Sequence, residues 1–158
     1  QKEHFLDLIQ LFPGVYKMLE ELRKKGFRMA LVTSRLKPTT YQGLDKFGIE
    51  KFFDVIITAD DVTKHKPDPQ PIDIALKNLE SSREQAVMVG DTKQDILCAK
   101  NAGVPAVLVN WSAAIPKGTA SGEYVPDYCL ETPGQLIDLI STINDQRKAE
   151  TSGEPHEK

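Results

Sequence analysis

The sequence has no long apolar run, because none of its hydrophobic stretches approaches the roughly 20 residues that cross a bilayer as a helix. It also has few cysteines: Cys98 and Cys129 are the only two, and they have neither CxxC spacing nor the spacing of a metal site. No signal-peptide pattern occurs either, so we expect a reduced, cytoplasmic protein whose two thiols are small buried side chains. A formal net charge of −3 gives no electrostatic argument for nucleic acid or an anionic membrane, so any anionic ligand must be held by local groups.

What the sequence does contain is a regular alternation of helical and strand patterns. Its 158 residues suit one domain with a substantial core, and 40% of them are hydrophobic. Short continuous apolar runs, typical of strands buried on both faces of a parallel sheet, occur at 29–32, 55–57, 86–89, 106–109 and, more weakly, 128–130. Apolar residues at helical spacing occur between these runs and after the last one, around 15–22, 38–47, 72–79, 93–102 and 136–143.

This alternation predicts an α/β fold in which right-handed βαβ crossovers build a Rossmann-like, three-layer α/β/α open parallel sheet. We expect the core to cover residues 13–145 and to be followed by a polar tail, 146–158, that has no apolar face and is disordered. In such sheets ligands bind beyond the carboxyl ends of the strands. The residues that directly follow each apolar run are therefore the candidates for chemistry.

The first two strand ends carry side chains suited to phosphate. Thr33 and Ser34 follow the first run and offer a hydroxyl and backbone N–H groups to a phosphate oxygen, although such residues also commonly cap helices. The loop after the second run holds Lys66 in front of a proline, and a lysine fixed there can place a positive charge on a phosphate. Its neighbours Lys64 and His65 are more simply solvated surface residues.

The third strand end carries two carboxylates four residues apart, Asp91 and Asp95, around an expected helix start. Oxygen ligands suit magnesium, which usually takes one or two protein carboxylates and keeps several waters. A structural alternative is just as strong, because Thr92 and Asp95 have the spacing of a capping box, with Asp where Glu or Gln is usual.

Taken in this order, the three segments resemble the second, third and fourth motifs of the haloacid-dehalogenase-like phosphatases. The matching segments are Leu-Val-Thr-Ser at 31–34, Lys-Pro-Asp-Pro at 66–69, and Val-Gly-Asp-Thr at 89–92 with Asp95. The likeness runs from about Phe12 to Ile143. Segments 52–54, 60–62, 100–103 and 126–128 resemble in particular the subgroup of phosphoglycolate phosphatases, inorganic pyrophosphatases and β-phosphoglucomutases.

The resemblance implies a magnesium-dependent hydrolase that acts on a small phosphorylated metabolite or pyrophosphate through an aspartyl-phosphate. Thr33 would hydrogen-bond a phosphate oxygen through its hydroxyl, helped by the backbone N–H of Ser34, and Lys66 would neutralise both the phosphate and the attacking carboxylate. Asp91 would bind Mg²⁺ directly, and Asp95 would hold it directly or through water.

Two further acidic residues, Asp60 and Asp61, also match the subgroup but more simply shape their loop. A phosphoacceptor receiver domain uses similar residue types, but its acidic residues come first along the chain, whereas here Asp91 comes last. Dinucleotide binding is disfavoured because no GxGxxG follows any expected strand. The main alternative is a catalytically silent binding or regulatory module of the same fold.

The sequence departs from the family at its beginning. The family's first motif, of the Asp-x-Asp-Gly-Thr type, supplies the nucleophile and the acid/base, and neither this motif nor the family's helical cap is found. We therefore expect the C-terminal part of a longer enzyme, inactive alone, in which residues 1–12 return from the cap. In the family the first strand lies between the strands that end at Thr33 and Asp91, so we expect a gap there, low stability, and possible self-association through the gap.

Overall fold

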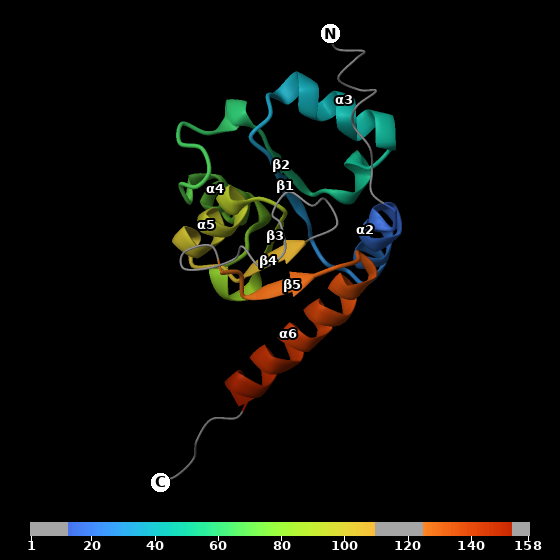
Figure 1. Cartoon of the computed structure of the whole chain (residues 1–158), viewed down its shortest axis with the longest axis vertical. Helices are drawn as coiled ribbons and strands as arrows, with labels where there is room; N and C mark the ends of the chain where they lie inside the picture. The colour runs from blue at the N-terminus through green and yellow to red at the C-terminus, as the bar shows by residue number, and fades with distance from the viewer. Residues whose placement is uncertain (1–12, 110–124, 153–158) are drawn as a thin grey trace.

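The computed structural model describes residues 13–109 and 125–152, and these residues form the expected α/β fold (Figure 1). Short strands alternate with helices along the chain. The strands are β1 (Ala30–Val32), β2 (Val55–Ile57), β3 (Met88–Gly90), β4 (Ala106–Val109) and β5 (Tyr128–Leu130). The helices are α2 (Val15–Lys24), α3 (Lys37–Phe47), α4 (Gln70–Leu79), α5 (Lys93–Ala102) and α6 (Gly134–Ser152). Short 3₁₀ turns occupy Glu50–Phe52, Ala59–Asp61 and Arg83–Gln85.

All paired strands are parallel, but within the described residues they form two sheets instead of one. One sheet has the order β1-β2 and the other has the order β3-β4-β5. In the first, Leu31 lies opposite Ile56, and in the second, Val89 lies opposite Val107. The strands β1 and β3 are not hydrogen-bonded to each other, which is the gap that the sequence predicted.

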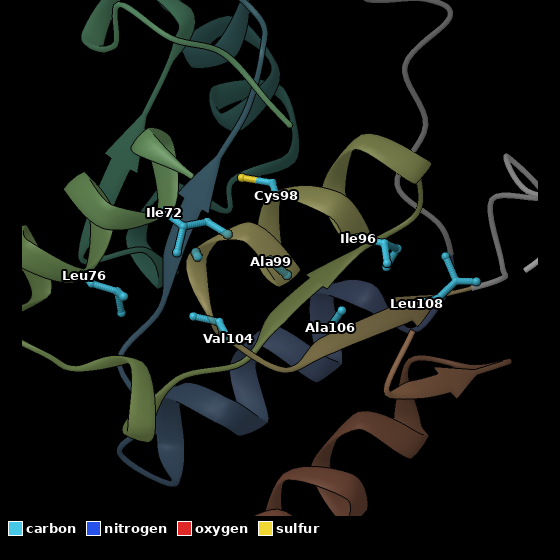
Figure 2. Close-up of a cluster of buried hydrophobic side chains, with 9 residues drawn as sticks. Ile72, Leu76, Ile96, Cys98, Ala99, Val104, Ala106 and Leu108 are labelled. Carbon is cyan, nitrogen blue, oxygen red and sulfur yellow. The ribbon is translucent and has the colours of Figure 1, made fainter. Parts of the chain in front are cut away.

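Helices cover both faces of these sheets, as the three-layer prediction requires. On one face α5 packs against β3 and β4, and α4 packs against β1 and β2. The two helices meet around fully buried residues such as Ile96 and Ala99, and Figure 2 shows this cluster. On the other face α2 and α6 pack against each other and enclose Val107 and Val109 of β4. The alternation of β4 between the two clusters explains why all four of its residues are buried.

The helix α6 corrects the expected boundary of the tail. The sequence predicted disorder from residue 146, whereas the helix continues to Ser152. The residues just after Asp145 are good helix formers even though they lack an apolar face. Within this extension, Arg147 Nη2 donates to the backbone oxygen of Ala86 at 3.0 Å and so ties the helix to the chain entering β3. Residues 1–12 and 153–158 lie outside the described residues.

The cysteines differ in their surroundings. Cys98 is completely buried, as expected, but Cys129 is exposed and so contradicts the sequence prediction. Cys129 lies in β5, the last strand of its sheet, where only the alternate side chains reach a covered face. No helix in ranges 13–109 and 125–152 is long and apolar enough to span a membrane.

Candidate active site

Lys66 brings three strand ends together. It lies in the loop after β2, and its Nζ donates to the backbone oxygen of Val32 in β1 at 3.3 Å. The same Nζ lies 2.6 Å from Oδ1 of Asp95, which follows β3. The side chains of Lys66 and Asp95 are only 11% and 9% exposed, so the ion pair is largely shielded from water. The carboxyl ends of the two sheets therefore meet at this lysine.

Backbone contacts hold the loop that carries Lys66. The amide of Asp68 donates to the His65 oxygen at 2.9 Å, and Asn101 Nδ2 donates to the Pro67 oxygen at 2.9 Å. The side-chain oxygen of Gln70 accepts from the amide of Lys64. The Lys66–Pro67 peptide bond is cis. Lys64 and His65 are exposed, in line with their interpretation as surface residues.

Asp95 forms the capping box that the sequence offered as an alternative to metal binding. Its Oδ2 accepts from the backbone N–H of Asp91 at 3.2 Å and of Thr92 at 3.3 Å. In return, the Asp95 amide donates to Thr92 Oγ1 at 3.2 Å, so α5 begins with a complete capping box. Since Oδ1 pairs with Lys66, both carboxylate oxygens of Asp95 already have partners.

Gly90 is required for this arrangement, a role that its motif alone does not reveal. A Cβ atom at position 90 would lie 2.4 Å from Cβ of Asp95, and real Cβ atoms essentially never come this close. Only glycine lets the Asp95 side chain fold back under the end of β3. The spacing of a glycine directly before two carboxylates was the available signal.

Asp91 is the carboxylate best suited to a cation. It is half-buried, and its carboxylate makes no hydrogen bond or ion pair with the described residues, in contrast to Asp95. Within the parts of the chain that the structure describes, no group of three or more His, Cys, Asp or Glu side chains is placed to hold a metal. Magnesium needs only one or two protein carboxylates, so the donor set fits Mg²⁺ as an open, water-rich site.

Thr33 and Ser34 lie at the end of β1, beside the Lys66 contact with Val32. The Thr33 amide extends the β1–β2 ladder by donating to the Ile57 oxygen at 3.0 Å, and its hydroxyl accepts from the Arg35 amide at 3.2 Å. Ser34 is exposed. The hydroxyl of Thr33 thus closes a local turn, and its second lone pair and its proton remain available to a ligand.

The acidic residues after β2 shape the loop, which confirms their structural interpretation. Asp60 Oδ2 accepts from the Lys37 amide at 2.7 Å at the start of α3. Asp61 accepts from the backbone and the hydroxyl of Thr58, and these hydrogen bonds hold the pKa of Asp61 below its ordinary value. The Ala59 amide also donates to the Arg35 oxygen at 2.9 Å. Together these bonds connect the loop after β2 to the segment that follows Thr33.

Cys98 lies close to the ion pair but is not a reactive thiol. Its Sγ contacts the Asp68 oxygen at 3.1 Å, and burial raises its pKa to about 11. A thiol with so high a pKa is almost entirely protonated near neutral pH, so the cysteine contributes packing and no nucleophile.

The protein is therefore a parallel α/β protein in which a shielded lysine, a hydroxyl and two carboxylates lie beyond the carboxyl ends of the strands. Comparison with known proteins then gives the family. The model of the haloacid dehalogenase-like hydrolases matches residues 1–109, and the chain belongs to this family.

The individual relatives agree with the subgroup expected from the sequence. Pyrophosphatase PpaX of Halalkalibacterium halodurans is 38% identical over 137 residues, which cover 87% of this chain and 63% of that protein. A HAD phosphatase of Thermococcus onnurineus superposes with a TM-score of 0.75 at 32% identity and covers 87% of this chain and 61% of its own. A predicted phosphoglycolate phosphatase of Haemophilus somnus 129pt superposes with a TM-score of 0.77 at 25% identity. The match covers 87% of this chain and 60% of that protein. The chain thus spans less than two thirds of the length of the proteins named here.

Proposed function

We propose that this chain is the C-terminal part of a magnesium-dependent phosphatase that acts on a small phosphorylated metabolite or on pyrophosphate. The observation that carries the proposal is the contact of Lys66 with both Val32 and Asp95, which holds a shielded positive charge where three strands end. The similarity to a pyrophosphatase and to phosphatases of known structure supports the same class of reaction.

The described residues would divide the work around one phosphoryl group. Thr33 would donate its hydroxyl proton to a phosphate oxygen, and the backbone N–H of Ser34 would add a second donor. Lys66 would neutralise negative charge that builds up in the transition state, and its low exposure strengthens that effect. Asp95 would keep Lys66 oriented through the bond to its Oδ1.

Asp91 would be the main protein ligand for magnesium, and Asp95 would support it, more suitably through water because both of its oxygens are already bonded. When bound, the metal would neutralise phosphate charge. The attacking carboxylate would come from a segment outside this chain, since the chain contains no Asp-x-Asp sequence followed by Gly-Thr. We therefore expect the chain to be inactive alone.

The test is phosphate release from pyrophosphate and from phosphoglycolate, measured over a magnesium titration. It compares this chain with a longer protein that also carries the segment with the nucleophile. We expect magnesium-dependent release from the longer protein only, and Asp91→Asn should weaken both the activity and its magnesium dependence. An unchanged magnesium titration in Asp91→Asn would contradict the metal assignment. A longer protein that binds phosphate but never releases it from a substrate would favour the silent binding module.

A further inference from the structure

One strip on the surface of α5 contacts the loop that carries Lys66. Its three members are spaced three residues apart, which makes them neighbours along the helix: Asp95, Cys98 and Asn101. They contact three consecutive residues of the loop, 66–68, one each. The helix α5 also lies beside α4, which follows the same loop (Figure 1). A regular element therefore holds the loop at each of these three residues.

The three contacts of this strip differ in kind. Asp95 pairs with the ammonium group of Lys66 and also caps α5, so it has two tasks. Cys98 belongs to the buried cluster, and its contact with the loop is a weak thiol hydrogen bond. Asn101 Nδ2 donates to the Pro67 oxygen at 2.9 Å, the ordinary distance of an amide hydrogen bond. Asn101 thus fixes the backbone at the residue that directly follows the lysine.

The helix itself does not explain an asparagine at position 101. Residue 101 lies inside α5, next to its last residue, Ala102, and asparagine has a lower helix propensity than alanine. Burial does not explain it either, because Asn101 is exposed. What the side chain provides is the hydrogen bond to the Pro67 oxygen, 34 residues away in the sequence.

A small shift of the loop would change the surroundings of Lys66. Its Nζ has two partners at once, the Val32 oxygen at 3.3 Å and Asp95 Oδ1 at 2.6 Å, and its side chain is only 11% exposed. A lysine ammonium is carried on a flexible four-carbon stem, so the stem alone does not fix its position. The position of the backbone that carries the stem therefore decides whether both contacts can be kept.

We propose that Asn101 is a positioning residue for Lys66. Its hydrogen bond to the Pro67 oxygen holds the loop so that the ammonium group stays in its shielded place. Asn101 acts on the reaction only through this lysine and does not itself contact the phosphoryl group. The inference rests on the proposed function for the catalytic importance of Lys66, but the placement of the ammonium group can be measured without turnover.

The first test is competitive acetylation of the lysines of this chain with acetic anhydride, followed by peptide mass spectrometry. In the parent chain Lys66 should react at least about tenfold more slowly than exposed Lys64 in the same loop. Asn101→Ala should raise the rate at Lys66 by about three- to tenfold, as expected for one lost hydrogen bond, and leave Lys64 unchanged. Asn101→Asp keeps the size of the side chain but replaces the donor with an acceptor, so it should cause at least the same rise. Lys100→Ala, at an exposed neighbouring position of α5, is the matched control and should change neither rate.

The second test is turnover in a longer protein that also carries the nucleophile. Asn101→Ala should lower kcat by about three- to tenfold and change KM by less than about twofold, because the lysine acts on charge that develops in the transition state. An unchanged acetylation rate at Lys66 would overturn the proposal. So would an equal rise at every lysine with a lower urea midpoint, which indicates a general loss of stability, or a faster rate at Lys66 with unchanged kcat. Faster acetylation of Lys66 alone, with no phosphate release from the longer protein in any form, would support the positioning and contradict the proposed function.

Discussion

The two half-sheets of this protein differ in what stabilises them. The three-stranded half has a closed core, in which Ile96, Cys98, Ala99 and Ala106 have no exposed surface. In the two-stranded half, β1 is only half-buried along its length. Asp54 accepts from the amide of Met29, just before β1, and Asp60 and Asp61 hold the loop after β2. The comparison teaches that a parallel sheet can keep its outer order when one strand position is open, provided that helices shared by both halves cover the faces.

Removal of Lys66, the residue that joins the two halves, should have the largest of the expected effects. In a longer protein that contains the nucleophile, Lys66→Ala would remove the shielded charge, and we expect the turnover number to fall by about 10³-fold or more. Steady-state phosphate release is the measurement. Lys64→Ala is the matched control, because Lys64 is exposed in the same loop and should change turnover less than about twofold. Equal losses in the two variants would show that the wrong lysine, or the wrong mechanism, has been assigned.

The difference in packing predicts the next largest effect. Ile96→Ala in the closed half should lower the free energy of unfolding by about 2–5 kcal/mol, because it leaves a cavity in a fully buried cluster. Leu31→Ala in half-buried β1 should lower it by less than about 2 kcal/mol. Urea denaturation of this chain gives both values. If Leu31→Ala is as damaging as Ile96→Ala, β1 is covered by something that the described residues do not include.

Gly90→Ala tests the close approach at the end of β3. The new Cβ would meet the root of the Asp95 side chain, which cannot swing away while both of its oxygens are bonded. We expect a loss of about 1–3 kcal/mol of unfolding free energy and a weaker capping box. Gly26→Ala is a useful control for the backbone effect alone, because position 26 has positive φ but no atom near an added Cβ. If Gly90→Ala is the milder of the two changes, the steric explanation is wrong.

Low pH should loosen the two-stranded half more than the three-stranded half. This is the smallest of the four expected effects. The hydrogen bond from Arg23 lowers the pKa of Asp54 below its ordinary value of 3.8, and hydrogen bonds from Thr58 lower that of Asp61. A carboxylate whose pKa is lower in the folded state stabilises the fold above the unfolded value, and this contribution is lost as the pH falls through the folded value. Hydrogen exchange below pH 4 should therefore report loosening at β1 and β2 before β4. Asp61→Asn should reduce this difference between the halves.

The sequence predicted the α/β class, the strand positions and the grouping of Thr33, Lys66, Asp91 and Asp95, because buried parallel strands give continuous apolar runs and their carboxyl ends share one edge. It could not decide between capping and metal binding for Asp95. That choice depends on which atoms lie within hydrogen-bonding distance, and the structure places Lys66 and two amides there.

Other features were beyond the sequence for a similar reason. The helix past Asp145 is held by a contact between Arg147 and Ala86, which are far apart in the chain. Cys129 is exposed because β5 is the last strand of its sheet. The local pattern of apolar residues does not predict the order of strands in a sheet. Local patterns predicted elements well, and long-range pairing determined what each residue in them does.

The position of Lys66 has a practical consequence for spectroscopy. Its ammonium group is attached to the segment after β2 and is bonded to the oxygen of Val32 and to the side chain of Asp95. Any sliding or rotation of one sheet against the other would change these bonds, and with them the chemical shift of a single nitrogen-15 label at Nζ. The chemical shift of this one lysine nitrogen would thus report changes in the alignment of the two sheets while partners, ions or temperature are varied.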